Sequence, residues 1–140
     1  MIGIVLSIED DSVTQVLNRI YFEDANFCQR MDEAMNGVEA LKYYENLNKN
    51  PEAFDKIPEI ILLDLNMPVM DGWEFLKAFN QLFPHFAERT NVFIHSSSAN
   101  PIDKEKAKQP EYRIIEFFPK PLDVDNINVM KEYIAKKRLM

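Results

Sequence analysis

Short apolar runs alternate with longer helix-like segments along the chain, and this alternation most constrains the fold. Each run is too short for a buried helix and reads as a strand. Strands that alternate with helices form parallel βαβ units, in which helices cover both faces of one sheet. The sequence therefore predicts an α/β fold with a doubly wound parallel sheet. The five expected strands are Ile2–Ile8, Asn26–Met31, Ile60–Leu63, Val92–His95 and Ile114–Phe118.

Five helices are expected between and after these strands. Ser12 is expected to cap the first helix, which carries Val13, Val16, Leu17 and Ile20 at helical spacing on one face. The polar segment Lys49–Glu59, with its two prolines, is expected to form a long loop. The other helices are expected to start at Asn36-Gly37 and to cover Trp73–Phe83, Asp103–Lys108 and Val124–Lys137.

Composition limits the partners and the compartment. The chain has 140 residues, of which 46% are hydrophobic, which suits one domain with its own core. A formal net charge of −7 argues against binding duplex DNA through overall charge. The single cysteine, Cys28, allows no internal disulfide and suggests a reducing compartment. The start of the chain lacks the features of a signal peptide, and no apolar run approaches the roughly 18 residues that span a membrane.

Polar residues follow four of the expected strands. In sheets of this kind, the carboxyl ends of the strands meet at one edge, where the working site lies. Each residue alone has an ordinary structural explanation, such as a helix cap at Asp11-Ser12 or a solvated charge at Lys120. Four strand ends that all carry such residues favour a shared site. The residues are Glu9-Asp10-Asp11, Asp64, Ser96-Ser97-Ser98 and Lys120.

This set of side chains suits phosphoryl chemistry. Carboxylates brought together repel one another unless a cation lies between them. A group of oxygen ligands without a nearby histidine or thiolate favours a hard ion such as Mg²⁺. An aspartate in such a group is able to act as a nucleophile towards phosphorus and form an aspartyl phosphate. The metal, a lysine and a hydroxyl would then stabilise the developing phosphoryl charge.

The chain resembles the receiver domain of two-component response regulators over essentially its whole length. The resemblance rests on "EDD" after the first strand, "LLDLNMPVMDG" at the third, "HSS" at the fourth and "FFPKP" at the fifth. The four motifs in this order are specific for the family. The resemblance implies a flavodoxin-like sheet with strand order 2-1-3-4-5, in a single stand-alone domain that covers residues 1–140 without an output domain.

The resemblance also implies a role for each residue at the acidic edge. Asp64 would be the phospho-acceptor. Glu9 and Asp10 would be the acidic pair that holds Mg²⁺ (or Mn²⁺), Asp10 directly and Glu9 through water. Together with Asp64, the backbone carbonyl of Asn66 would complete the protein ligands. The loop beside Asp64 would be shaped by Pro68 and by Asp71-Gly72.

The fourth and fifth strands would carry the switch. Ser96 is the hydroxyl expected to move onto the phosphoryl group, and Lys120 is expected to pair with that group. The Lys120-Pro121 bond is expected to be cis, and Phe117 takes the place of the switch aromatic. Three residues depart from the commonest pattern: Glu9 replaces an aspartate, Ser96 replaces a threonine, and Phe117 lacks the hydroxyl of a tyrosine.

The resemblance implies a signalling protein rather than an enzyme. A sensor histidine kinase or a phosphotransfer protein would phosphorylate it. A downstream protein would bind the face formed by the fourth helix, fifth strand and fifth helix. We expect a cytoplasmic bacterial protein, monomeric or dimerising on phosphorylation, with no nucleic-acid or membrane partner.

Three other functions fit the sequence less well. A phosphohydrolase of the haloacid-dehalogenase type needs a second aspartate two positions after the nucleophile, where this chain has Asn66. A flavodoxin-like phosphate binder would not place Glu9-Asp10-Asp11 after its first strand, because these carboxylates repel phosphate. A degenerate receiver, acting only as an interaction module, would not need an intact acceptor, acidic pair, hydroxyl and lysine.

Four other conspicuous residues have structural roles as their simplest interpretation. His85 is expected in an exposed loop, and His95 is expected to point away from the site because it precedes Ser96 on a strand. Cys28 is expected to be a small hydrophobe on a strand. Trp73 is expected to contribute to helix packing.

Overall fold

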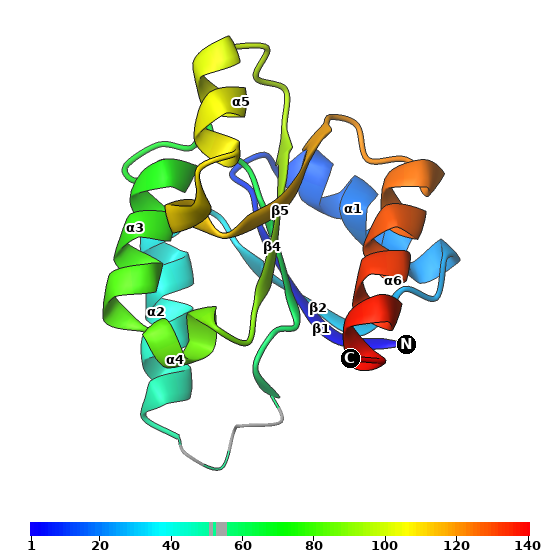
Figure 1. The fold of residues 1–140 in the computed structure, drawn as a ribbon, viewed down its shortest axis with the longest axis horizontal. Helices are drawn as coiled ribbons and strands as arrows, with labels where there is room; N and C mark the ends of the chain where they lie inside the picture. Colours follow the sequence, from blue (N-terminus) through cyan, green and yellow to red (C-terminus); the bar gives the residue numbers. More distant parts are fainter. Residues whose placement is uncertain (51, 53–55) are drawn as a thin grey trace.

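Five parallel strands form one sheet in the order β2-β1-β3-β4-β5 (Figure 1). The computed structural model describes residues 1–50, 52 and 56–140. The predicted fold class and strand order are confirmed. The strands are β1 (Ile2–Ile8), β2 (Cys28–Ala34), β3 (Ile60–Leu63), β4 (Asn91–Ser96) and β5 (Ile114–Pro119).

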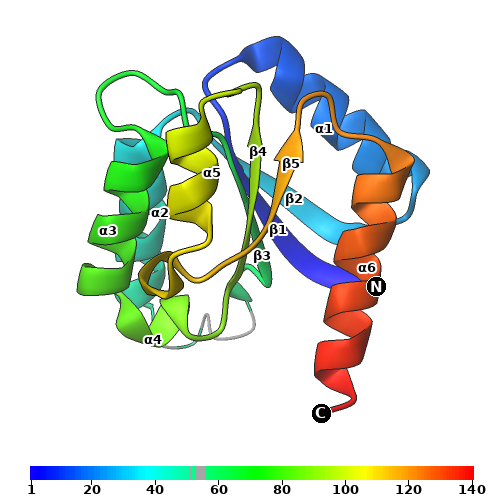
Figure 2. The same cartoon turned by 45° about the horizontal axis from the view of Figure 1, so that its top comes forward.

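Helices cover both faces of the sheet. In Figures 1 and 2, α1 and α6 lie on one face, and α2, α3 and α5 lie on the other. No helix in the described part of the chain is long and apolar enough to cross a membrane. The helices are α1 (Ser12–Asp24), α2 (Gly37–Asn48), α3 (Gly72–Leu82), α4 (Pro84–Ala87), α5 (Pro101–Ala107) and α6 (Val124–Arg138), with a 3₁₀ turn η2 (Pro110–Tyr112).

The short helix α4 is an addition to the five helices predicted. Phe83 leaves the helical conformation, with φ −130° and ψ 55°, and so ends α3. Pro84 then starts a new turn, since its fixed φ suits the first position of a helix. The predicted fourth and fifth helices therefore correspond to α5 and α6. Part of the predicted loop Lys49–Glu59 lies outside the described residues.

The core consists of two apolar layers on either side of the sheet. All four residues of β3 are buried, because this central strand is covered on both faces. Ile61 and Leu63 pack with Tyr44 and the aromatic residues of α3 in one layer. Ile60 and Leu62 pack in the other layer, against residues that include those of α6. Burial of these four apolar residues on both faces thus fixes β3, the strand that Asp64 directly follows.

The predicted second strand was placed too early. Asn26 adopts a left-handed conformation with φ 48°, and the Phe27 N–H donates to the carbonyl of Phe22 at the end of α1. These residues therefore form the turn after α1, and β2 starts at Cys28. The strand continues to Ala34 because β2 is an edge strand, on which charged side chains such as Arg30 reach solvent.

Helix α1 presents its apolar stripe to solvent. Its side chains Val13, Val16, Leu17 and Ile20 are between 38% and 63% exposed, whereas Gln15 and Asn18 are buried. The reason lies at the end of β1, where the amide of Gln15 donates to the carbonyl oxygens of Ser7 (3.0 Å) and Glu9 (3.2 Å). The helix turns its polar side inward to satisfy these groups. The expected cap, Ser12, is wrong by one residue: Asp11 caps the helix.

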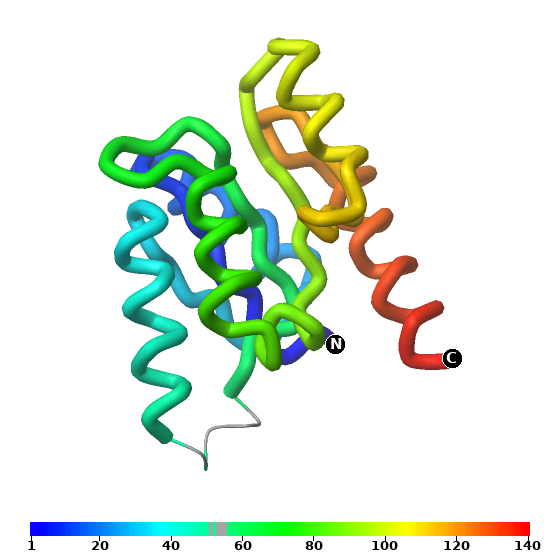
Figure 3. The backbone as a smooth tube through the Cα atoms, turned by 60° about the vertical axis from the view of Figure 1, so that its left-hand side comes forward, coloured from blue at the N-terminus to red at the C-terminus, as the bar shows by residue number. Residues whose placement is uncertain are grey.

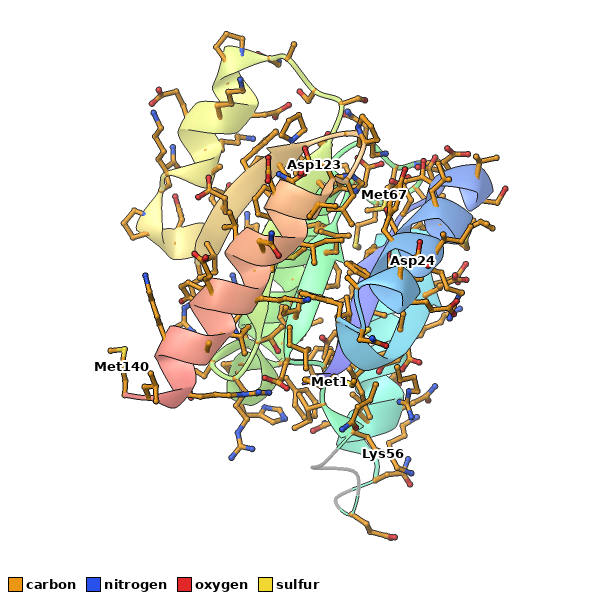
Figure 4. All side chains as sticks on the ribbon, turned by 90° about the vertical axis from the view of Figure 1, so that its right-hand side faces the viewer. Met1, Asp24, Lys56, Met67, Asp123 and Met140 are labelled. Atoms are coloured by element: carbon orange, nitrogen blue, oxygen red, sulfur yellow. The ribbon has the colours of Figure 1, made fainter. Side chains whose placement is uncertain are left out.

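The segments that follow β1, β3, β4 and β5 meet at one end of the sheet (Figure 3). Figure 4 places Met67 and Asp123 at this end and Lys56 at the opposite one. The parallel direction of all five strands causes this gathering. The residues predicted to act together therefore share this end of the molecule.

Candidate functional site

Three carboxylates converge at this end. One oxygen each from Glu9, Asp10 and Asp64 lies within 4.8 Å of the others. The backbone holds them in place, because the Asp64 N–H donates to the Ile8 carbonyl (3.0 Å) and the Glu9 N–H donates to the Ala34 carbonyl (3.0 Å). Glu9 is 2% exposed and Asp64 is 4% exposed, whereas Asp10 is exposed. The carboxylates thus stand at the ends of hydrogen-bonded strands rather than on a free loop.

Lys120 supplies the cation beside these carboxylates. Its Nζ lies 2.5 Å from Oε1 of Glu9 and 3.4 Å from Oδ2 of Asp64. The backbone N–H of Lys120 donates to the carbonyl of Ser96 (3.2 Å), which joins β5 to the end of β4 at the site. The Lys120-Pro121 peptide bond is cis. Lys120 therefore bridges one member of the acidic pair and the expected acceptor.

Burial and crowding shift the pKa values at the site. Burial raises the pKa of Glu9 to about 7, and the charge of Asp64 adds to this effect, against the opposing contacts from Lys120 and the Asp11 N–H. Burial acts against the ammonium of Lys120, but its hydrogen bond to Glu9 and the charge of Asp64 outweigh this and raise its pKa. One lysine thus offsets part of a charge that three carboxylates share.

The donor set fits a magnesium ion. Glu9, Asp10 and Asp64 offer carboxylate oxygens, which hard divalent cations prefer. Asn66 follows two residues after Asp64, and its N–H lies 3.4 Å from Oδ1 of Asp64. The carboxylate of Asp11 instead accepts a hydrogen bond from the Thr14 hydroxyl (2.6 Å) at the start of α1. Glu9 and Asp10, rather than Asp11, are therefore the carboxylates beside Asp64 that are candidates to hold the ion.

Ser96 and Phe117 lie together beside this cluster. Ser96 is the last residue of β4 and is fully buried. Phe117 is half-buried on β5 and packs against the core layer that contains α3. Both line a groove of about 740 Å³ between α5 and β5, together with Ser97, Lys104, Lys108 and Lys120. The predicted switch residues thus border one open space.

The loop after Asp64 is fixed by its junction with α3. Asp71 and Glu74 form a reciprocal capping box, in which each side chain accepts from the backbone N–H of the other residue. The N–H of Gly72 donates to the carbonyl of Leu65 (2.9 Å). A Cβ at Gly72 would lie only 2.7 Å from the carbonyl oxygen of Asp64. The glycine therefore allows the loop to close against the strand end.

Three further polar residues contribute to the site region, and two of them, Gln15 and Asp103, were not singled out from the sequence. Gln15 bonds the carbonyl oxygens at the end of β1. Ser98 and Asp103 are hydrogen-bonded to each other at 2.5 Å beside Ser96. The serine run after β4 was recognised only as a whole, and nothing in the spacing of Asp103 indicated its partner.

The two histidines have different environments. His95 is 2% exposed on β4, and its Nε2 has no hydrogen-bond partner among the described residues. Burial, assisted by the charge of Lys120, lowers the pKa of His95 to about 4. His85 is exposed and lies on α4 rather than in the predicted loop, with its Nε2 3.1 Å from Oδ1 of Asn48. Cys28 lies half-buried on β2, and burial raises the pKa of its thiol to about 11.

The buried His95 should make the fold sensitive to acid. Its pKa is about 4 in the fold and about 6.5 when unfolded, so this contribution to stability is complete above pH 6.5 and is lost as the pH falls towards 4. The loss is up to about 3 kcal/mol. Glu9 opposes it, because its raised pKa stabilises the fold as the pH falls from 7 towards 4.5.

Comparing variants isolates the contribution of His95. Urea unfolding of the wild type and of His95→Leu should show free energies that diverge between pH 6.5 and 4, with the wild type losing more. The matched control is His85→Leu, which removes an exposed histidine and should follow the wild type. Parallel curves for wild type and His95→Leu would show that His95 does not titrate in this window.

The fold and the acidic edge define a doubly wound α/β domain with a site at the carboxyl ends of its strands. The sequence profile of the response regulator receiver domain matches residues 5–132. The chain therefore belongs to the response regulator receiver domain family, a family of signalling domains that interact with histidine kinases and downstream targets.

Solved structures agree with this assignment. A two-component response regulator from Cytophaga hutchinsonii superposes with a TM-score of 0.84 at 28% identity, covering 96% of this chain and 98% of the other. A two-component response regulator from Legionella pneumophila superposes with a TM-score of 0.73 at 27% identity, covering 94% and 97%. Both are similar to this chain over nearly their full length.

Curated relatives are longer proteins. A protein-glutamate methylesterase/protein-glutamine glutaminase from Methanococcoides burtonii is 27% identical over 132 residues, which are 94% of this chain and 34% of the relative. The sensor histidine kinase CheAY of Helicobacter pylori is 38% identical over 72 residues, which are 51% of this chain and 8% of the relative. The chain thus spans about a third or less of the length of these relatives.

Proposed function

We propose that the chain is a phospho-accepting response regulator in which Asp64 takes up a phosphoryl group in the presence of Mg²⁺. One observation carries the proposal: the carboxylate of Asp64 stands at the end of a buried strand, among the oxygens of Glu9 and Asp10 and 3.4 Å from the ammonium of Lys120. Burial on a rigid strand suits a nucleophile that must be presented in one orientation.

The chemistry is a transfer of the phosphoryl group onto a carboxylate. An oxygen of Asp64 attacks phosphorus, and the bond from phosphorus to the donor breaks. The leaving group is imidazole for a phosphohistidine donor or acetate for acetyl phosphate, and the product is an acyl phosphate. The metal held by Glu9, Asp10, Asp64 and the Asn66 carbonyl would neutralise phosphoryl oxygens. Lys120 pairs with a phosphoryl oxygen, and the hydroxyl of Ser96 donates to another.

Uptake of phosphoryl should be measurable without knowledge of the partner. Incubation with acetyl phosphate and Mg²⁺ should raise the intact mass of the wild type by one phosphoryl group, because the donor needs no protein recognition. The Asp64→Asn variant and the wild type in chelator should stay at their starting masses. Equal labelling of wild type and Asp64→Asn would contradict the assignment of the acceptor.

The output of the switch lies on the face formed by α5, β5 and α6. Movement of the Ser96 hydroxyl onto the phosphoryl group vacates space towards which Phe117 is able to turn. Phe117 has no hydroxyl to bond outside the domain, so it favours the inward position more than tyrosine would, and the two states differ less. The groove between α5 and β5 changes with it, and a downstream protein or a second copy binds there.

Fluoroberyllate, which mimics an acyl phosphate, should reveal this coupling. Backbone amide chemical shifts should change around Glu9, Asp10 and Asp64 and also on α5 and β5. The second change is expected because Ser96 and Phe117 line the same groove. The response should be absent in Asp64→Asn. Shifts confined to Glu9, Asp10 and Asp64 would contradict the proposed output face.

A further inference from the structure

Helix α5 is attached to the domain mainly by polar contacts. None of its seven described residues is buried, so apolar burial contributes little to its position. The three half-buried residues, Asp103, Lys106 and Ala107, are spaced as one face of a helix. In Figure 2 this helix stands beside α3, on the same side of the sheet. Contacts from this face must therefore fix α5 and the loop that leads into it.

Asp103 makes the central contacts on this face. Its Oδ1 accepts from the indole N–H of Trp73 at the start of α3 (2.9 Å), and its Oδ2 accepts from the hydroxyl of Ser98 (2.5 Å). The Nζ of Lys106 lies 5.5 Å from the centre of the Trp73 ring. Both carboxylate oxygens of Asp103 are thus engaged, one by α3 and one by the loop after β4. We call Trp73, Ser98 and Asp103 the Asp103 clasp.

The Asp103 clasp extends to the switch hydroxyl. The backbone N–H of Ser98 donates to Oγ of Ser96 (3.2 Å), and the hydroxyl oxygen of Ser98 also accepts from the N–H of Asn100 (3.3 Å). A serine hydroxyl has one proton to give and lone pairs to accept with. With one lone pair of Ser96 engaged by Ser98, its proton remains available to donate towards an anion at Asp64. This hydrogen bond links the position of Ser98 to the hydroxyl of Ser96.

We propose that Asp103 is a positioning residue for phosphoryl transfer, acting through Ser98 on the hydroxyl of Ser96. This inference rests on the proposed function of Asp64. Asp103 holds the loop so that the Ser96 hydroxyl meets the charge that develops on the phosphoryl group. The same carboxylate transmits any movement of Ser96 to Trp73, the only tryptophan of the chain.

Two variants and one control separate this role from simple attachment of α5. Asp103→Asn keeps the size of the side chain but removes its charge and one acceptor. Ser98→Ala removes only the hydroxyl that bonds Asp103. The control is Glu105→Gln, which makes the same charge change at an exposed position of α5. All three should keep the stabilisation by Mg²⁺, because Glu9, Asp10 and Asp64 lie outside the clasp.

The two variants should take up the phosphoryl group more slowly but bind the donor as tightly as the wild type. With acetyl phosphate and saturating Mg²⁺, the maximal rate constant of uptake should fall about tenfold in Asp103→Asn and Ser98→Ala, as expected for loss of an aligned charge-assisted contact. The half-saturating concentration of acetyl phosphate should stay unchanged, because Ser96 acts on charge that develops during transfer. The emission of Trp73 should respond to uptake in the wild type and not in Asp103→Asn.

The outcomes distinguish a failure of the proposed function from a failure of the role of Asp103. Wild type that takes up no phosphoryl group would overturn the proposed function and this inference with it. Uptake at equal maximal rates in wild type, Asp103→Asn and Ser98→Ala would overturn this inference alone. If Asp103→Asn does not give a cooperative melt, Ser98→Ala decides, since a wild-type rate in that variant overturns the role of the clasp.

Discussion

Mg²⁺ should raise the melting temperature of this domain by about 9 °C when present at roughly 100 times its dissociation constant. The reason is that Glu9, Asp10 and Asp64 converge only in the folded chain, with oxygens within 4.8 Å, so the ion binds the native state. At that concentration, linkage adds about 2.7 kcal/mol to the free energy of unfolding. Paired thermal melts, with Mg²⁺ and with chelator at constant ionic strength, measure the shift.

Replacing Asp10 tests the origin of this shift. Lys120 forms ion pairs with Glu9 and Asp64, so the charge of Asp10 adds to a carboxylate cluster that the lysine only partly offsets. Asp10→Asn should therefore raise the metal-free melting temperature and flatten the response to Mg²⁺. The control Asp24→Asn makes the same charge change at the end of α1, at an exposed position. If Asp10→Asn and wild type respond equally to Mg²⁺, the three acids are not a metal site.

A single methyl group at Gly72 should destabilise the domain by about 3 kcal/mol or more. The new Cβ would lie 2.7 Å from the carbonyl oxygen of Asp64 and 2.9 Å from Cα of Leu65. Both atoms belong to backbone that continues from the buried strand β3, so neither moves aside without shifting the strand end. Urea unfolding gives the loss in stability, and uptake from acetyl phosphate should slow because Asp64 is displaced.

Gly37 offers a matched comparison, since it also opens a helix and its Cβ would meet a neighbour at 2.7 Å. That neighbour is the side chain of Met70, which has several rotatable bonds and is able to turn away. Gly37→Ala should therefore cost about 1 kcal/mol or less. The gain in helix propensity is the same in both variants and cancels in the comparison. Equal losses would show that the contact with the Asp64 backbone is not the cause.

The sequence predicted the sheet and its acidic edge because both depend on local pattern. Buried strands such as Ile60–Leu63 show as apolar runs, and the parallel direction of the strands then brings their ends together. Glu9, Asp10 and Asp64 needed no tertiary information beyond this direction, and the structure brings their oxygens together. Lys120 joins them because β5 ends at the same edge of the sheet.

Helix α1 shows where local pattern fails. Its apolar residues have helical spacing, which normally marks the buried face. The amide of Gln15 donates to the carbonyl oxygens of Ser7 and Glu9 at the end of β1, and it reaches them only because the polar side of α1 faces inward. A hydrogen bond between two elements does not change the spacing of apolar residues in either of them. Val13 and Val16 are exposed because the polar side of α1, which carries Gln15, faces the sheet.

The contacts of Asp103 could not be predicted from the sequence, because they also depend on how two elements pack together. Thirty residues separate Asp103 from Trp73, and their hydrogen bond depends on how α5 lies against α3. A short polar helix without buried residues has no periodic pattern that predicts its orientation. The residues that contact Asp64 lie at strand ends, whereas Asp103, which contacts Ser98 and Trp73, lies on a helix.

Borohydride reduction of the phosphorylated protein tests the central claim most directly. An acyl phosphate is reduced to an alcohol, so a phosphorylated aspartate becomes homoserine, whereas a free carboxylate is left intact. After treatment with acetyl phosphate and Mg²⁺, peptide mass spectrometry should find homoserine at position 64 and unmodified aspartate at Asp10, Asp11 and Asp71. Homoserine at another aspartate, or phosphoryl uptake without reduction at Asp64, would contradict the account.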